Sequence, residues 1–215
     1  TGSFDFKIRT NSVFRDFSAW YHVVVAFDTT QATASNRIKF YVNGVQVTDL
    51  GQSDYPSQNH DSYFNSNVLH NIGRYNSGST QWFQGYMAEI NFIDGLQLTP
   101  ASFGETNSDT GQWVPIDTSG LTFGTNGFRL KFADNSGTSA TTLGKDSSGN
   151  GNNYTPNNFV TGDAVKDTPT NNFATLRMMG TPFESGAGFS EGNLELVTGS
   201  TNSARNLNRQ AFSPM

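Results

Sequence analysis

The hydrophobic pattern of this chain is that of β-strands, and it is clearest between residues 20 and 47. From residue 20 to residue 27 both alternating faces are apolar or aromatic except at His22, which predicts a strand buried on both sides. Residues 37–42 then alternate strictly between polar and apolar side chains, as a strand with one buried face does. Asn43 and Gly44 follow, and they are the residue types that tolerate the positive φ angles of a two-residue hairpin.

No stretch in this region has the three-to-four spacing of an amphipathic helix. The pattern therefore predicts an all-β fold made of two antiparallel sheets packed face to face. The side chains that we expect between the two sheets are Val23, Val25, Phe27, Ile38, Phe40, Val42 and Ile90.

Two segments together carry a resemblance to a known fold. The first reads SAWYHVVVAFDTT and then NRIKFYVNGVQV, and the second reads IGRYNSGSTQWFQGYMAEINFIDGLQ. This combination resembles the laminin G-like jelly roll of the concanavalin A-like lectin and glucanase superfamily, over roughly residues 1–100. The resemblance implies a two-sheet jelly-roll sandwich. It starts in mid-domain, so we expect the first strands of that domain to be missing from this sequence.

The chain beyond residue 100 is less regular. GFRLKF alternates as a strand, with Phe128, Leu130 and Phe132 on one face. Residues 134–158 are rich in Gly, Ser, Thr and Asn, which is typical of a long loop or linker. We expect a laminin G-like sandwich over 1–133, a linker or irregular C-terminal extension over 134–190, and the beginning of a second β domain over 191–215.

KDSSGNGNNYTPNNF and KDTPTNNFATL resemble a segment common in bacteriophage structural and tail-fibre-like proteins. There the segment follows a laminin G-like domain and precedes a SPRY-like sandwich, whose first strand here would be GNLELVTG. The resemblance loosens at NFATLRMMG, where such proteins usually read NFATLNPL. It implies a virion or extracellular location, with other virion proteins, further copies of the chain (a homo-oligomer, of which a trimer is one form) and a host surface glycan as partners. The ends at Thr1 and Met215 fit a piece of a larger polypeptide.

Composition excludes several other classes. The net charge of -5 gives no basic footprint for nucleic acid. No apolar run is long enough to span a bilayer, so we expect no membrane insertion. The chain has no cysteine, which rules out a disulfide framework and a thiolate metal site. The three histidines have no paired spacing that would hold zinc, and His22 is expected to be a hydrogen-bonded core or interface residue.

A glucanase-like motif is the one catalytic candidate. Glucanases of the superfamily carry Glu-x-Asp-x-x-Glu on one strand, and this chain has Glu89, Asn91 and Asp94 at those positions. Asn91 lacks the charge that tunes the nucleophile. Asp94 is one methylene shorter than the glutamate that serves as the acid/base in glucanases. This changes the separation of the two carboxyl groups, which must be about 5–5.5 Å in a retaining enzyme. We therefore expect no catalytic residues and no enzyme, with a laminarinase-like glycoside hydrolase as the least favoured alternative.

Two kinds of binding site remain open. Rings stack on sugar faces, and the exposed candidates in polar loops are Tyr55, Tyr63, Tyr75 and Trp82, with Asn76 to hold hydroxyls. These rings are equally explained by packing of the loop on the sheet. No cofactor is expected except that calcium is left open, at a sandwich rim with the carboxylates Asp49, Asp54 and Asp94, or at the loop that starts at Asp146.

The polar segment 134–176 suggests an assembly role. Ordering each residue costs roughly 1–2 kcal/mol, and this segment has few aliphatic side chains with which to offset that cost. We expect it to pack on another protein surface through Tyr154, Phe159 and Phe173. Three functions remain: a virion structural or adhesion protein (tail-fibre, tail-tip or capsid-decorating), a carbohydrate-binding module of a secreted bacterial protein, and the glucanase.

Overall fold

The expected fold class is confirmed. A computed structural model describes residues 6–16, 19–75 and 81–171, and the backbone of four short strands nearer the C-terminus. The described residues are mostly strands and irregular segments, and their helix is confined to three short turns, α1 (Ala34–Arg37), η1 (Pro100–Ser102) and η2 (Thr161–Asp163). The strands are β1 (Lys7–Thr10), β2 (Val23–Phe27), β3 (Ile38–Val42), β4 (Val45–Gln46), β5 (Leu50–Asp54), β6 (Ile90–Phe92), β7 (Gly104–Thr106), β8 (Trp113–Pro115), β9 (Phe128–Leu130), β10 (Thr175–Met178), β11 (Gly188–Ser190), β12 (Glu195–Val197) and β13 (Arg209–Phe212).

The predicted hairpin belongs to the three-stranded sheet β2–β3–β4, which we call the central sheet. β2, β3 and β4 form an antiparallel sheet, in which Val23 lies opposite Val42 and Val42 lies opposite Val45. Asn43 and Gly44 connect β3 to β4 with φ angles of 48° and 79°, the geometry of the two-residue turn that the sequence predicted.

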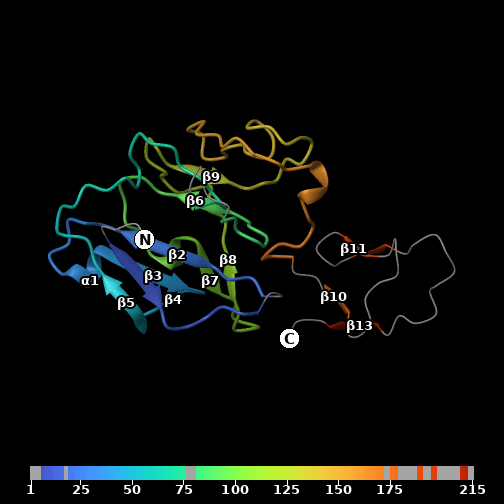
Figure 1. The fold of residues 1–215 in the computed structure, drawn as a ribbon, viewed down its shortest axis with the longest axis horizontal. Coiled ribbons are helices and arrows are strands. Elements are labelled where there is room, and N and C mark those ends of the chain that lie inside the picture. Colours follow the sequence, from blue (N-terminus) through green and yellow to red (C-terminus); the bar gives the residue numbers. More distant parts are fainter. Residues whose placement is uncertain are drawn as a thin grey trace.

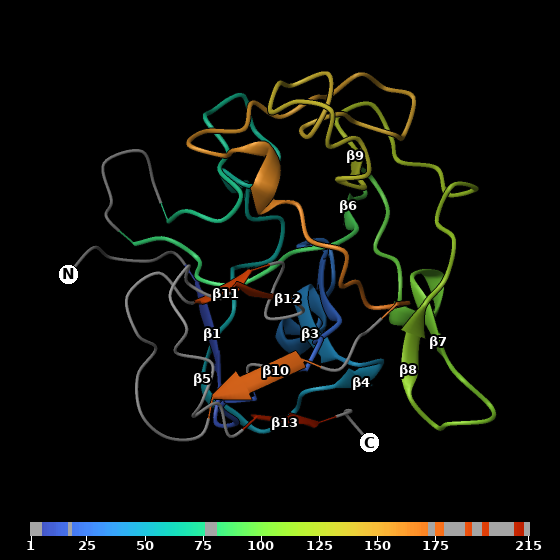
Figure 2. The ribbon, with the colours of Figure 1, turned by 90° about the vertical axis from the view of Figure 1, so that its right-hand side faces the viewer.

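The other strands pair around this sheet, and every pair is antiparallel. β1 pairs with β5, β6 with β9, and β7 with β8. In Figure 1 the β6–β9 pair lies above the central sheet. Figure 2 shows β1 and β5 on one side of the central sheet, and β7 and β8 on the other. This arrangement is consistent with a concanavalin A-like β-sandwich.

A chain of aromatic rings joins the central sheet to the β6–β9 layer. The ring of Phe27 lies 5.9 Å from that of Phe64, which lies 5.5 Å from that of Phe92. Phe92 then stacks on Phe128 at 5.4 Å. Each such pair contributes about 0.5–1.5 kcal/mol beyond its buried area. Aromatic side chains therefore form the contact between the layers. The buried apolar residues of the described chain are Ala26, Ile38, Phe123, Phe128 and Leu130.

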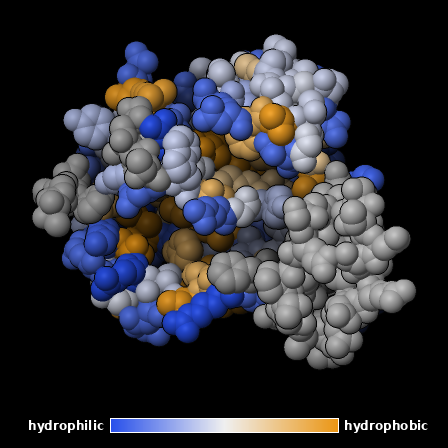
Figure 3. Space-filling model, turned by 45° about the vertical axis from the view of Figure 1, so that its right-hand side comes forward, coloured by the Kyte–Doolittle hydropathy of each residue, from blue (hydrophilic) through white to orange (hydrophobic). Residues whose placement is uncertain are grey.

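Two side chains that we expected inside the sandwich are exposed. Val23 and Val25 share a face with Phe27, as predicted, but their side chains are 53% and 56% exposed. Figure 3 shows apolar residues gathered in a hollow between the two layers. The prediction was wrong because it assumed that β2 lies in the middle of a closed sheet, whereas in the described chain β2 pairs on one side only, with β3.

Strand β9 follows the predicted alternation for only part of its length. Phe128 and Leu130 are buried, at 8% and 1% exposure. Phe132 has a φ angle of 53°, which is uncommon for a bulky side chain and ends the regular strand before that residue. Arg129, expected on the polar face, is only 5% exposed, because carboxylates of other segments pair with it.

The irregular segment after β9 packs on the same chain. Asp146 forms a bridge with Leu130, and the Ser147 amide donates to the Arg129 carbonyl at 2.7 Å. The Tyr154 amide then donates to the Gly144 carbonyl at 2.9 Å. In Figure 1 this yellow and orange segment lies over β9. Residues 139–154 are therefore fastened to the sandwich by their own chain.

The C-terminal strands are described by their backbone alone. β10 pairs with β13 and β11 with β12, both antiparallel. β12 lies within GNLELVTG, where a strand was expected. The domain boundaries at 133 and 190, and the SPRY-like nature of the last part, stay predictions. Among the described residues no helix has the length and hydropathy needed to cross a bilayer.

Candidate functional site

The most prominent surface feature is a hairpin that carries aromatic side chains. Two of its backbone hydrogen bonds run from the Phe83 amide to the Gly73 carbonyl at 2.8 Å and from the Tyr75 amide to the Gln81 carbonyl at 3.2 Å. Arg74 and Trp82 face each other across it as an antiparallel bridge. We call the described parts of this feature, residues 73–75 and 81–86, the aromatic hairpin.

Arg74 orients the largest ring of the aromatic hairpin. Its guanidinium carbon lies 4.5 Å from the centre of the Trp82 ring system, within the range of a cation–π contact. Trp82 nevertheless remains 52% exposed, and Tyr75, Phe83 and Tyr86 are exposed by 60%, 55% and 53%. Because the indole is held by Arg74 and still faces solvent, it can offer a preformed surface for a flat apolar ligand face.

The predicted sugar-binding residues are only partly brought together. Tyr75 and Trp82 share the aromatic hairpin. Tyr63 is 76% exposed on a separate turn, which is anchored by the ring of Phe64 in the interlayer chain. Tyr55 is half-buried beside the fully buried Pro56. Asn76 lies outside the described residues.

The glucanase-like residues take part in structural contacts on the outer side of β6. Glu89 binds the Arg129 Nε at 3.2 Å, and Arg129 also binds Asp117 through Nη2 at 3.1 Å. Asn91 accepts a hydrogen bond from the Thr118 hydroxyl at 3.0 Å. Asn91 lies opposite Arg129 in the ladder, so both are on the face away from the buried Phe128 and Leu130. Glu89 therefore contacts strand β9 through Arg129, and Asn91 contacts the segment at Thr118.

The calcium candidates are held apart. Asp49 precedes β5 and Asp54 ends it, so about 17 Å of strand separates them. The Asp94 carboxylate instead accepts from Asn65 Nδ2 at 2.7 Å and from the Asn126 amide at 3.0 Å. Within the described ranges, three or more metal-ligating side chains of the His, Cys, Asp and Glu types do not come together.

The Asp146 loop holds a buried carboxylate. Asp146 is 6% exposed and accepts hydrogen bonds from the amides of Arg129, Ser148 and Asn152 at 2.8 to 2.9 Å. The Ser148 hydroxyl donates to it as well, at 2.9 Å. Burial alone would raise the pKa of this carboxyl, but together these hydrogen bonds outweigh burial and lower the pKa. The carboxylate therefore connects the loop to β9 by hydrogen bonds.

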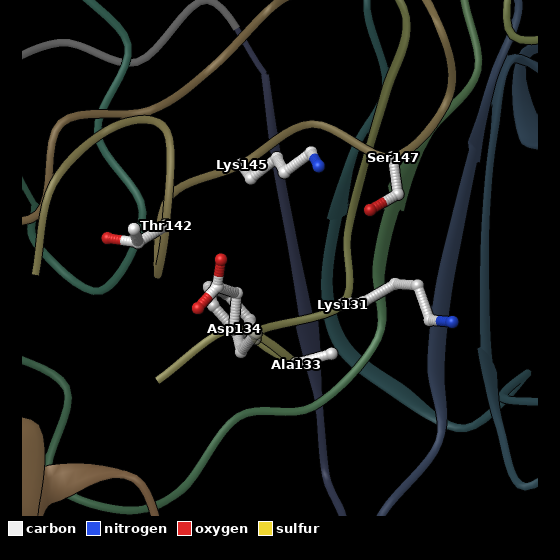
Figure 4. A pocket seen from close by; sticks show the side chains of 7 residues that line it. Lys131, Ala133, Asp134, Thr142, Lys145 and Ser147 are labelled. Carbon is white, nitrogen blue, oxygen red and sulfur yellow. The ribbon is translucent and has the colours of Figure 1, made fainter. Parts of the chain in front are cut away.

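A shallow depression lies beside Asp146, since Lys145 and Ser147 line it. It has a volume of about 230 Å³ and is lined by Lys131, Phe132, Ala133, Asp134, Thr142, Lys145 and Ser147. Figure 4 shows the Asp134 carboxylate directed into it, while the Lys131 amine points away. Asp134 also accepts from the Ser136 hydroxyl and amide, and these bonds lower its pKa. A single exposed carboxylate in an open depression does not define a ligand.

The three expected interface anchors have different environments. The Tyr154 ring lies 4.8 Å from that of Phe128 and is half-buried in the chain itself, and burial raises the pKa of its phenol. Phe159 is 52% exposed and free to contact another surface. Phe173 lies outside the described residues.

His22 has a structural partner. Trp113 Nε1 donates to His22 Nδ1 at 3.0 Å, which fixes the neutral imidazole because a protonated ring could not accept at Nδ1. Burial lowers the pKa of His22, in agreement. Sequence reasoning missed Trp113 because it lies in β8, 91 residues after His22, and no local pattern relates the two.

The described residues thus form an antiparallel β structure with exposed aromatic side chains in the aromatic hairpin. Residues 1–102 match the family model of the concanavalin A-like lectin/glucanases superfamily, of the laminin G type. Residues 1–102 are therefore similar to a concanavalin A-like, laminin G-like domain, a class compatible with a lectin-like or a structural role. Comparisons with curated proteins and with solved structures found no match.

Proposed function

We propose that this chain is a structural and adhesion component of a bacteriophage virion, such as a tail-fibre, tail-tip or capsid-decorating protein. The observation that carries the proposal is the aromatic hairpin, which displays rings outside the core of a sandwich whose polar clusters are structural. The phage-like segment between residues 145 and 176 supports the virion context. In this role the sandwich serves assembly, and the hairpin contacts a host glycan.

The virion assignment is tested on particles. Bacteriophage particles are purified by density gradient from a lysate of the strain that encodes the chain. Peptides of the chain are then quantified by mass spectrometry against the major capsid protein. We expect a fixed copy number per particle that survives a high-salt wash. Absence from the particles contradicts the virion role.

A carbohydrate-binding module of a secreted bacterial protein is the second candidate, favoured by the same hairpin. On a glycan array, we expect Trp82→Ala to weaken binding at least tenfold, because a stacked sugar loses its apolar contact. Leu69→Ala is the matched control, since Leu69 is 72% exposed and is not one of the residues of the aromatic hairpin. Equal loss in both variants would rule out a site at Trp82. Glycan binding by a chain that is absent from particles would select the secreted module.

We propose that the chain is not a glycoside hydrolase. Glu89 is paired with Arg129, and Asn91 stands where a carboxylate is needed. We expect no reducing sugar from laminarin, lichenan or agarose at any pH between about 4 and 8. Release that disappears in Glu89→Gln and persists in Asp117→Asn, which alters the other carboxylate on Arg129, would overturn this prediction.

A further inference from the structure

The sequence contains three Asn-Gly pairs, at Asn43, Asn126 and Asn150. In such a pair the amide nitrogen of the glycine can attack the side-chain carbon Cγ of the asparagine, because glycine has no side chain to obstruct the approach. The N–Cγ bond forms, the Cγ–Nδ2 bond breaks and ammonia leaves, which closes a five-membered succinimide ring. Water then opens the ring to aspartate or to isoaspartate. The structure gives the three pairs different environments.

Asn43 already has the φ angle that suits the closed ring in a hairpin. A planar ring fixes ψ of the asparagine at about −120°, the value for the first central residue of a type II′ turn, where φ is about +60°. Asn43 has a φ angle of 48°, whereas Asn126 and Asn150 are not among the residues with positive φ. Type II′ is also one of the two turns favoured in two-residue hairpins.

The hairpin can pass from its present turn to type II′ by one local rotation. Types I′ and II′ share the φ angle of the first central residue and differ in the orientation of the peptide plane between the two central residues. Gly44 would change from its φ of 79° to about −80°, and glycine adopts both values. The Asn43 amide keeps its hydrogen bond to the His22 carbonyl, at 2.8 Å, because φ of Asn43 is unchanged. Ring closure is therefore compatible with the pairing of β3 and β4.

The side-chain amide of Asn43 is polarised, and its nitrogen is free to leave. Oδ1 accepts a hydrogen bond from the His22 amide at 2.9 Å, and a donor at this oxygen stabilises the negative charge that develops on it during attack. Asn43 is exposed, and its Nδ2 makes no hydrogen bond within the described chain, so water can protonate the departing nitrogen. The Gly44 amide, which is the nucleophile, has no acceptor among the described residues either.

The other two pairs lack these conditions. The Nδ2 of Asn150, which would have to leave, donates to the carbonyls of Gly124 and Gly127 at 2.6 and 2.9 Å. At Asn126 the attacking nitrogen belongs to Gly127, which is buried. Gly127 is packed so closely that an added Cβ would collide with the Phe123 carbonyl oxygen, and rotation of its peptide would displace that backbone.

We propose that Asn43-Gly44 is a site of spontaneous deamidation in the folded chain, through a succinimide formed within the hairpin. Water is the only co-reactant. Either product places a negative charge beside His22, whose amide donates to the Asn43 side chain. Isoaspartate also carries the main chain through Cγ and so adds one backbone atom between β3 and β4. This modification does not depend on the virion assignment.

Peptide mass spectrometry of the aged full chain tests the site. The folded chain and the chain unfolded in urea are incubated at mildly alkaline pH in buffer made with heavy-oxygen water, which labels each carboxylate formed by hydrolysis. The labelled aspartate and isoaspartate forms are then quantified at all three pairs. In urea we expect similar rates, because glycine follows asparagine in each. In the folded chain Asn43 should react at least about tenfold faster than the other two.

The comparison among the three pairs decides the outcome. Equal rates at the three pairs in the folded chain would show that the reaction needs unfolding, and this overturns the proposal, as does faster reaction at Asn126 or Asn150. Asn43→Gly is the control variant, since Gly-Gly also fits a two-residue hairpin. It should abolish the fast phase of ammonia release from the folded chain. A fast phase that persists in this variant also overturns the proposal.

Discussion

Replacing Asp146 with alanine should destabilise the chain by about 3–5 kcal/mol, because several buried donors would lose their acceptor together. The carboxylate accepts three backbone amides and one hydroxyl while only 6% exposed. One of those amides belongs to Arg129 of β9, so the loss reaches the sandwich itself. Urea unfolding followed by tryptophan fluorescence measures the change.

Asp134→Ala is the matched control for this prediction. Asp134 also accepts an amide and a hydroxyl, both from Ser136, but it is exposed. Its loss should have only a small effect on the free energy of unfolding, since water replaces the acceptor. Similar losses in the free energy of unfolding for the two variants would show that the hydrogen bonds of Asp146 do not hold the loop on β9.

The same carboxylate should give the chain a specific acid sensitivity. Its pKa is lowered in the folded state from an ordinary value of 3.8. The stabilisation is therefore fully present above that value and is lost as pH falls through it towards the folded-state pKa. Unfolding curves between about pH 5 and pH 2 should show a loss of stability for the wild-type chain that is smaller in Asp146→Asn. Parallel pH profiles for the two proteins would refute the assignment.

The sequence predicted the features that depend on local pattern. The alternation of residues 37–42 and the Asn43-Gly44 turn are both in the structure, because a period of two and two positive φ angles are local properties. The strand at Phe128 was likewise found. Composition also predicted a long irregular segment after residue 133, which has little regular structure in the described range.

The sequence could not show which side chains are buried or which distant residues pair. Val23 and Val25 have the pattern of core residues, and only the strand pairing shows that, within the described chain, β2 pairs on one side alone, with β3. Asp146 appeared as a linker residue, because its donors on Arg129 and Asn152 are 17 and 6 residues away. The sequence motif also did not show that Glu89 pairs with Arg129. Arg129 is 40 residues away in the sequence and lies on β9. Charge pairing over such separations leaves no local signal.

Gly44→Ala should cost about 2–4 kcal/mol, well above the usual effect of alanine at a turn glycine. The φ angle of Gly44 is +79°, and a Cβ there would lie 2.4 Å from the Trp113 ring carbon Cζ3. The indole would have to move, and that movement also breaks its hydrogen bond to His22. Trp113 therefore needs a side chain as small as glycine's at the hairpin that the sequence identified first.

Gly111→Ala separates strain from collision. Gly111 has a φ angle of +70°, and no atom lies within 4 Å of the place that an alanine Cβ would take there, so this change should cost only about 1 kcal/mol of backbone strain. A double-mutant cycle gives the second control. In a Trp113→Ala background the cost of Gly44→Ala should fall to about 1 kcal/mol as well, a coupling of about 1–3 kcal/mol. If Gly44→Ala costs no more than Gly111→Ala in the wild-type chain, Trp113 does not pack on the hairpin, and the contact between β8 and the central sheet must lie elsewhere.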